Sequence, residues 1–288
     1  MQNLYLIDGH AVMYRYHHAF YNNPLITSKG VNTSATWGMA NLVTTILKNY
    51  PASHIAVIFD PPYRTWRKEL YPEYKANRTH ADDLTPQLEM AFHMLKVWGV
   101  YSSAFRPLEA DDALGILAKM AEAQGIQTYI VTKDKDFCQL VNDNIKLLDL
   151  GKTVGKDEAT IIDRDAVKAR HGVFPEQIVD YLTLLGDTSD NVPGVEGVGK
   201  KGASELLTKY GTLDEIYKNI DSFTKKRKEN FEQAREGVKI ANKLINLALE
   251  YKLPVTMDNL IRPHINNTDL LELFEEWEFY SVIKAMAD

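Results

Sequence analysis

Short apolar runs alternate with helical patterns in the first half of the chain, and this alternation limits the fold more than any other feature. The runs are LYLI, HIAVIF, VYSSAF, TYIV and IKLL, rich in β-branched and aromatic residues, as buried strands are. Longer stretches with helical spacing, such as PQLEMAFHMLKVWG and DDALGILAKMAEAQG, separate them. Strands that alternate with helices predict an α/β fold whose central sheet is mostly parallel and flanked by helices.

The pattern becomes helical and short-looped near residue 165, with segments such as PEQIVDYLTLLG and KGASELLTKYG that end in glycine. We therefore expect an α/β core over residues 1–165 and a helical domain over residues 166–265. The amphipathic segment 266–288 is predicted to form a helix that packs back on the core.

Composition and length exclude several classes of protein. The 288 residues, 45% of them hydrophobic, are enough for a large packed core. No apolar run approaches the roughly 18 residues of a membrane span, and the N-terminus lacks the regions of a signal peptide. The single Cys138 excludes an internal disulfide and a cysteine-based zinc cluster. These features predict a cytoplasmic protein with no membrane partner.

Acidic residues follow the predicted strands. Asp8 comes directly after LYLI, Asp60 directly after HIAVIF, and Asp134 and Asp136 come shortly after TYIV. The carboxyl ends of parallel strands meet at one edge of a sheet, so we expect these acids to lie together. Five further acids complete the candidate set: Glu109, Asp111 and Asp112 at a helix start after VYSSAF, and Asp187 and Asp190 at a helix end.

The stretch LEADD places three carboxylates in four positions, and their mutual repulsion must be relieved. One acid in a first helical turn is stabilised by the helix dipole, and solvent exposure would relieve several. A basic partner and a bound cation are the other remedies. The eight histidines show no metal-ligand spacing, so the oxygen ligands favour Mg²⁺ or Mn²⁺ over zinc. Many enzymes that hydrolyse phosphodiesters use two such ions bound close together.

The net charge of −6 is concentrated in these nine acids, because the rest of the chain has 33 basic and 30 acidic residues. Residues 63–78, YRTWRKELYPEYKANR, interleave basic residues with Trp66, Tyr71 and Tyr74, as a surface that binds nucleic acid does. The alternative is an amphipathic helix whose aromatic side chains enter the core.

The stretch NVPGVEGVGKKGAS lies between two predicted helices and matches a helix-hairpin-helix. Glycine-rich turns at helix starts present backbone N–H groups to phosphates, so this hairpin is expected to grip a DNA backbone without reading bases. Its candidate DNA-binding residues are Gly194, Gly197, Gly199, Lys200 and Lys201. Two interpretations of the run KKRK at residues 225–228 remain open: a basic surface that contacts DNA and a solvated helix face.

Five motifs occur in an order that resembles the structure-specific 5′ nuclease (flap endonuclease) family, above all the 5′-3′ exonuclease domain of bacterial DNA polymerase I. They are YLIDGHAVMYR, FDPPYRTWRKELYPEYKANR, LEADDALG, TKDKDFCQLV and LLGDTSDNVPGVEGVGKKGASELL. The resemblance implies a PIN-like nuclease core, a helical gateway near residues 63–85 and a helix-hairpin-helix domain. The implied activity is 5′-3′ exonuclease and 5′-flap endonuclease cleavage of DNA in replication and repair.

The resemblance also implies roles for individual residues. The nine acids resemble the family's metal site, which holds two Mg²⁺ or Mn²⁺ ions, and K⁺ at the hairpin is left open. Arg15 resembles an early phosphate contact, and Tyr74 looks like a gateway residue. The residues expected to carry the reaction are Lys75, Arg78, Asp60 and Asp112.

One departure from the family pattern concerns the residue before Asp134, which is Lys133 where the family has glycine. Lysine lacks the backbone freedom of glycine, so the loop shape or the metal affinity is expected to differ. The alternative function is therefore a DNA-junction binder without catalysis. The expected partners are DNA with a 5′ end or flap and a DNA polymerase, with the chain monomeric. Its length predicts either a separate nuclease or the N-terminal portion of a polymerase.

Overall fold

The computed structural model describes residues 2–77, 82–151, 154, 157–265 and 267–287. Its centre is a six-stranded sheet in the order β3-β2-β1-β4-β5-β6. Strands β1 to β5 run parallel, and β6 is antiparallel at one edge. The strands are β1 (Asn3–Asp8), β2 (His54–Ile58), β3 (Tyr101–Ser103), β4 (Gln127–Val131), β5 (Ile145–Asp149) and β6 (Thr160–Ile162). The predicted fold class is confirmed, whereas β6 was not predicted.

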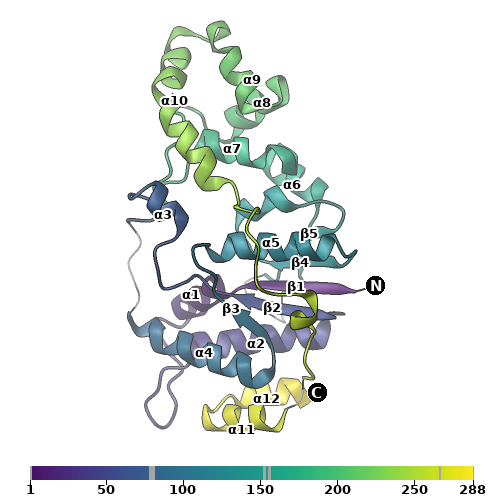
Figure 1. Cartoon of the computed structure of the whole chain (residues 1–288). Helices are drawn as coiled ribbons and strands as arrows, with labels where there is room; N and C mark the ends of the chain where they lie inside the picture. The colour runs from purple at the N-terminus through teal and green to yellow at the C-terminus, as the bar shows by residue number, and fades with distance from the viewer. Residues whose placement is uncertain (1, 78–81, 152–153, 155–156, 266, 288) are drawn as a thin grey trace.

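Helices cover both faces of the sheet. They include α1 (Gly9–Ala19), α2 (Ser34–Asn49), α4 (Thr85–Trp98) and α5 (Ala110–Glu122). Leu4 and Leu6 of the central strand β1 face the core beside α5, whereas Tyr5 and Ile7 face the core beside α1, α2 and α4. Figure 1 shows α5 above the sheet and α2 and α4 below it. This period of two is expected of a strand that is buried on both faces.

A helical part rises beyond the α5 side of the sheet (Figure 1). Its helices are α6 (Arg164–His171), α7 (Ile178–Leu185), α8 (Lys200–Tyr210), α9 (Leu213–Lys218) and α10 (Lys225–Ile245). The short helix α3 (Trp66–Leu70) lies beside the C-terminal end of α10. The described part of the expected gateway contains this helix and a single 3₁₀ turn at residues 82–84. The 3₁₀ helices are η1 (Asp82–Leu84), η2 (Lys135–Leu140), η3 (Pro175–Gln177), η4 (Ile220–Ser222) and η5 (Met257–Leu260).

The C-terminal segment returns to the opposite end of the molecule. It forms two helices, α11 (Thr268–Glu276) and α12 (Tyr280–Ala287), where the sequence predicted one. The left-handed backbone of Glu278, with a φ of 61°, separates the two. Both helices pack on the core beside α2 and α4. Among the described residues, none of the helices combines the length and the apolarity that crossing a membrane requires.

The strand order places a binding crevice at one edge of the sheet. The chain moves outward from β1 in one direction through β2 and β3 and in the other through β4 and β5. The carboxyl ends of strands on either side of such a switch point leave a crevice between them. Asp8 ends β1, and the segments after β2 and β4 begin at this same edge.

The glycines of the predicted hairpin differ in how tightly they pack. A Cβ on Gly194 would lie 2.6 Å from the backbone nitrogen of Gly186 and closer still to the carbonyl oxygen of Leu185. Gly199, the N-cap of α8, would place a Cβ in open space. The close backbone packing of the turn after α7 therefore requires glycine at position 194, independently of any contact with phosphate.

We predict that Gly194→Ala lowers the free energy of unfolding by about 1–3 kcal/mol, because the added methyl group meets backbone atoms that cannot move aside. The matched variant Gly199→Ala should cost less than about 1 kcal/mol, the size of an N-cap effect. Urea unfolding of both variants measures the difference. Equal losses would show that the close approach at Gly194 is not a constraint.

Candidate active site

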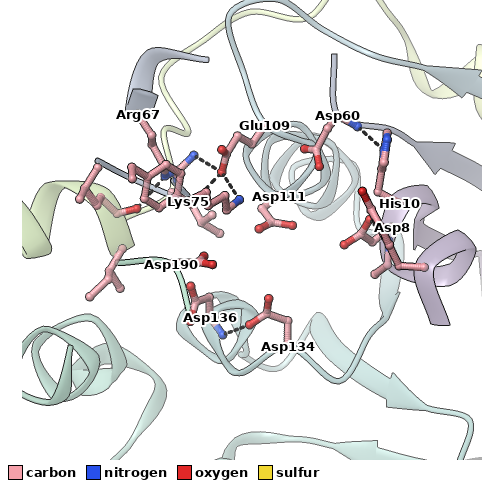
Figure 2. Close-up of a pocket in the computed structure, with 16 residues that line it drawn as sticks. Asp8, His10, Asp60, Arg67, Lys75, Glu109, Asp111, Asp134, Asp136 and Asp190 are labelled. Atoms are coloured by element: carbon pink, nitrogen blue, oxygen red, sulfur yellow. Dashed lines mark hydrogen bonds and ion pairs between the residues drawn. The ribbon is translucent and has the colours of Figure 1, made fainter. Parts of the chain in front are cut away.

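A cavity of about 250 Å³ opens at the carboxyl ends of the strands (Figure 2). The structure brings seven of the nine predicted acids to its walls, from β1, from the segments after β2 and β4, from the start of α5 and from the loop after α7. They are Asp8, Asp60, Glu109, Asp111, Asp134, Asp136 and Asp190.

Backbone N–H groups hold the first of these acids in place. The N–H of Ala11 in α1 donates to Asp8 at 3.0 Å, and the N–H of Ala110 in α5 donates to Asp60 at 2.8 Å. The same geometry recurs after β4, where the N–H of Asp136 donates to Asp134 at 2.9 Å. One oxygen of each carboxylate is thus held by a backbone N–H group from the first turn of a helix.

Burial and crowding disfavour the charged form of these acids. Burial first, and then the neighbouring Asp60, raise the pKa of Asp8 to about 7. Burial and Asp134 raise the pKa of Asp136 to about 7 as well. The pKa of Asp111 is raised well above its ordinary value by burial, Asp8 and Asp134. The protein thus does not stabilise the charged form of these three acids, and a cation bound among them would lower their pKa values.

Glu109 is buried and accepts four hydrogen bonds from the gateway segment, which we define as residues 63–77. Thr65 Oγ1 donates at 3.2 Å and Arg67 Nη1 at 3.4 Å. Tyr74 Oη donates at 3.1 Å and Lys75 Nζ at 3.0 Å. These bonds dock the gateway segment against the wall of the cavity and direct the Lys75 ammonium toward it.

The backbone at Lys75 is unusual for a residue with a side chain. Its φ is 53°, and its N–H donates to the carbonyl of Asp190 at 2.9 Å. Asn191 is also left-handed, with a φ of 57°, and its Nδ2 donates to the carbonyl of Glu73 at 3.1 Å. Backbone of this kind is found at functional sites, where surrounding contacts maintain it. Here the gateway segment and the loop after α7 maintain each other.

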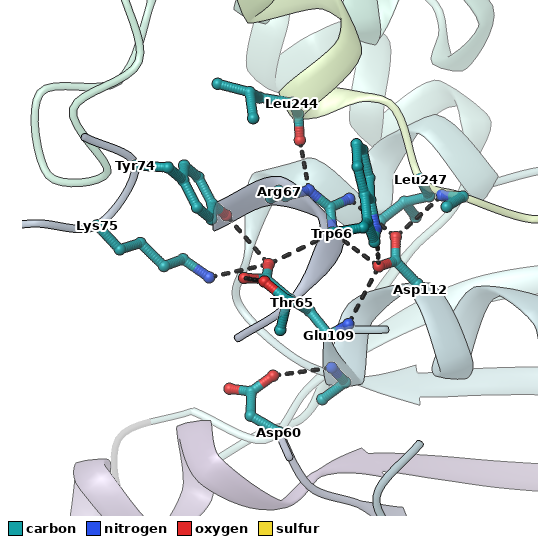
Figure 3. Close-up of polar contacts among 12 residues, drawn as sticks. Asp60, Thr65, Trp66, Arg67, Tyr74, Lys75, Glu109, Asp112, Leu244 and Leu247 are labelled. Atoms are coloured by element: carbon teal, nitrogen blue, oxygen red, sulfur yellow. Dashed lines mark hydrogen bonds and ion pairs between the residues drawn. The ribbon is translucent and has the colours of Figure 1, made fainter. Parts of the chain in front are cut away.

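Asp112 differs from the other acids of the predicted metal set, because it does not line the cavity and both of its carboxylate oxygens accept hydrogen bonds from the protein (Figure 3). Arg67 donates to its two oxygens at 2.7 and 2.8 Å, and Trp66 Nε1 donates at 3.0 Å. The backbone N–H of Ala248 donates at 2.9 Å. Arg67 also reaches the carbonyl of Leu244 at the end of α10, so the Asp112–Arg67 pair joins three segments of the chain.

Asp187 lines an adjoining cavity of about 10 Å³ together with Asp136 and Asp190. Lys135 Nζ donates to it at 2.8 Å. Although burial opposes the shift, the hydrogen bonds from Lys135 and Ser189 lower the pKa of Asp187 to about 2. This acid is therefore charged and already paired.

Lys133, the departure from the family pattern, points away from the cavity. Its Nζ lies 3.2 Å from the Asp149 carboxylate. It is not one of the three described non-glycine residues with a positive φ, so the loop accepts lysine without strain. Asp134 and Asp136 line the cavity in its presence.

The remaining predicted residues are spread over the chain. Tyr74 is 5% exposed, so its ring is not available to stack on a base, and its hydroxyl supports Glu109 instead. Arg15 donates to the carbonyl of Gly151 at 2.7 Å and lies outside the cavity lining. Arg78 lies outside the described residues, so its predicted role stays a prediction.

The hairpin residues lie at the start of α8, on the helical part. Gly197 has a φ of +77°, which favours glycine, and Gly199 is the N-cap of α8. Lys200 and Lys201 form the first turn, and the Lys201 side chain is 90% exposed. The cavity and the hairpin are thus separate features.

His10 and Arg67 are among the residues of the cavity wall that the sequence did not identify as site residues. His10 lies two positions after Asp8, but the histidines were considered only for metal-ligand spacing. Arg67 was grouped with basic residues expected to contact phosphates, yet it is 2% exposed. The sequence signals for the burial of Arg67 were its hydrophobic neighbour Trp66 and its position in a predicted amphipathic helix.

The donor set fits a hard divalent cation. Among the described residues, no three Asp, Glu, His or Cys side chains form a ready-made metal centre. The acids stand apart around the cavity instead, as expected of charges that repel one another. Oxygen ligands, here carboxylates, are what Mg²⁺ and Mn²⁺ prefer.

Comparison with protein families identifies the class to which this fold and site belong. The 5'-3' exonuclease N-terminal resolvase-like domain matches residues 3–172, and the 5'-3' exonuclease C-terminal SAM fold matches residues 173–268. The chain belongs to the 5'-3' exonuclease family. The resemblance drawn from the five motifs is confirmed.

Relatives of two lengths match the chain. A 5'-3' exonuclease of Aquifex aeolicus is 34% identical over 99% of this chain and 95% of its own length. A DNA polymerase I of Caldicellulosiruptor bescii is 33% identical over 98% of this chain but only 33% of its own length. The chain thus spans about a third of the polymerases that it matches.

Solved structures share the fold. The T5 D15 protein, co-crystallised with metal ions, superposes with a TM-score of 0.71 and 20% sequence identity, over 99% of this chain and 100% of its own. The catalytic core of Rad2 in complex with a DNA substrate superposes with a TM-score of 0.61 and 13% identity, over 99% and 91%. At these identities the likeness establishes the architecture alone.

We predict that Asp111→Asn raises the melting temperature of the metal-free protein at pH 8. The ordinary pKa of an Asp is about 4. Because folding raises the pKa of Asp111, stability is lost as the pH rises from about 4 through the folded value, and the amide removes that loss. The gain should be about 1–2 kcal/mol, or roughly 2–8 °C, in EDTA.

The gain should shrink at pH 5, where the folded carboxyl is protonated, which differential scanning calorimetry at both pH values measures. The control is Asp143→Asn, which removes the same charge from an exposed turn and should shift the melting temperature by less than about 1 °C. A lower melting temperature for Asp111→Asn at pH 8 would contradict the crowding of charge in the cavity.

Proposed function

We propose that the chain is a divalent-metal-dependent 5′-3′ exonuclease and 5′-flap endonuclease that hydrolyses DNA phosphodiesters at or near a 5′ end. The observation that carries this proposal is the wall of seven carboxylates around one cavity at the carboxyl ends of the strands. Membership of the 5'-3' exonuclease family supports the direction of cleavage. We expect the products to carry 5′-phosphates.

The proposed ligands are Asp8, Asp60, Glu109, Asp111, Asp134, Asp136, Asp187 and Asp190, and the proposed cofactor is a pair of Mg²⁺ ions. Bound there, such ions supply an activated water and neutralise the charge that develops on the phosphate. A structure of T5 5'-exonuclease with bound divalent metal ions supports a divalent cofactor. K⁺ at the hairpin is proposed as a further bound ion.

Lys75 supplies a positive charge at the cavity. Burial opposes its charged form, but Glu109 and Tyr74 raise its pKa well above the ordinary value, so the ammonium group stays protonated. A fixed ammonium group stabilises the negative charge that grows on the scissile phosphate. Arg78, three residues further along, is proposed to share this role.

The proposed DNA path has two contacts. The hairpin at α8, with Lys200 and Lys201 in its first turn, holds the duplex backbone. The single strand with the 5′ end passes the gateway segment and reaches the cavity. A T5 D15 pseudo-enzyme-product complex with DNA and metal ions supports DNA as the substrate.

We further propose a DNA polymerase as the partner, because the polymerase I relatives join a matching segment to about twice its length of further chain. A polymerase creates the displaced 5′ strands that such a nuclease removes. We propose that the chain acts as a monomer in the cytoplasm, which fits a DNA substrate and a single Cys138.

The direct test uses a duplex with a labelled 5′ flap. We predict cleavage near the flap junction with Mg²⁺ and no cleavage with EDTA. Asp60→Asn should reduce the single-turnover rate by at least about 10³-fold, because Asp60 lies at the cavity wall, while flap affinity in Ca²⁺ changes less than about threefold.

The matched control Asp143→Asn should cleave at the rate of the wild type. If the chain binds the flap tightly but leaves it intact in Mg²⁺ and in Mn²⁺, it is the DNA-junction binder without catalysis. If Asp60→Asn cleaves normally at low millimolar Mg²⁺, the reaction takes place outside this cavity.

A further inference from the structure

His10 is a cavity residue to which the proposed reaction gives no role. It is the second residue of α1, it lies two positions after Asp8, and it lines the cavity with Tyr14 one helical turn further on. Its ring meets the ring of Phe59 edge-on at a centroid distance of 5.7 Å. In Figure 2, His10 and Lys75 lie on opposite sides of the cavity.

The sequence Asp-Gly-His brings this ring close to the end of β2. A Cβ on Gly9 would lie 2.5 Å from the ring of Phe59, so only glycine lets α1 begin this near to the strand. The approach allows the backbone N–H of Asp60 to donate to Nδ1 of His10 at 3.0 Å. His10 therefore contacts the backbone of one proposed metal ligand.

This hydrogen bond determines which nitrogen of the ring carries the proton. A backbone N–H can donate only to a nitrogen with a free lone pair, so Nδ1 of His10 is unprotonated. A neutral imidazole must then carry its proton on Nε2. A nitrogen that carries a proton cannot bind a metal ion, so Nε2 is a hydrogen-bond donor and His10 is not a metal ligand.

The Nε2–H group of His10 has no acceptor among the described residues, since its one hydrogen bond is made by Nδ1. Nε2 is also not one of the five buried polar atoms of the described chain that lack a partner, so it is open to the cavity. Asp8 and Asp60 are nearby, yet neither carboxylate accepts from it. An acceptor must come from whatever occupies the cavity.

We propose that Nε2–H of His10 donates a hydrogen bond to a non-bridging oxygen of a DNA phosphate in the cavity, on the side opposite Lys75. The inference rests on the proposed nuclease function and adds a substrate contact to it. A neutral donor suits this position because it binds a phosphate oxygen without bringing a positive charge that would compete with divalent ions for Asp8 and Asp60.

Two variants separate this contact from the bond to Asp60. His10→Asn places an amide oxygen near the position of Nδ1, so it can still accept from the Asp60 N–H, but it has no donor at the position of Nε2. His10→Gln does the reverse, because its longer side chain carries an amide N–H₂ to the position of Nε2. If the ring is only structural, His10→Asn should retain more activity than His10→Gln. If the ring contacts a phosphate, His10→Gln should retain more.

We predict that His10→Asn lowers kcat/KM for a 5′-flap duplex about 10- to 100-fold, the usual effect of losing a hydrogen bond to a charged group. His10→Gln should recover at least several-fold of that loss. Replacing single phosphates near the junction with methylphosphonates identifies the contact, because the affected linkage should slow the wild type but not His10→Asn any further.

Nitrogen NMR of the free protein tests the tautomer without any reaction, with His10→Asn identifying the signal. A proton on Nδ1 would overturn the inference, and so would cleavage by His10→Asn at the rate of the wild type or a greater loss in His10→Gln than in His10→Asn. Failure of the wild type itself to cleave would remove the proposed function, whereas the tautomer would still be decided.

Discussion

The crowding of carboxylates at the carboxyl ends of the strands is the constraint on which the rest of this structure depends. Backbone N–H groups of Ala11 and Ala110 fix Asp8 and Asp60, so these acids cannot rotate away from their neighbours. The pKa of Asp8 rises to about 7 as a consequence of burial and Asp60. The two apolar cores of the sheet offset the free-energy cost of this arrangement, and we propose that a bound divalent cation relieves it.

A second cluster, made of Arg67, Asp112 and the carbonyl of Leu244, stabilises the segments around the cavity. Arg67 joins the gateway segment to Asp112 in α5 and to the carbonyl of Leu244 at the end of α10. Both charged side chains are almost fully buried, and loss of either partner would cost about 3–5 kcal/mol. The helical part that carries the hairpin is thereby tied to the element that presents Glu109.

Much of the fold followed from the sequence, because apolar runs and the acids after them locate strands and the edge where those strands end. The different positions of Asp111, which lines the cavity, and Asp112, which pairs with Arg67, did not follow from the sequence. Adjacent residues of a helix point in directions about 100° apart, so only one faces the cavity. The partner of Asp112 is 45 positions away, and no local pattern indicates it. The break at Glu278 and the burial of Tyr74 also depend on tertiary packing.

The central claim is that these carboxylates hold divalent cations between them. An anomalous difference map from crystals of the protein soaked in Mn²⁺ measures this directly, because it locates the ions without reference to activity. We predict strong peaks inside the cavity, within ligand distance of Asp8, Asp111 and Asp134, and none beside Asp112. Peaks confined to surface carboxylates, or a cavity without manganese, would contradict the account.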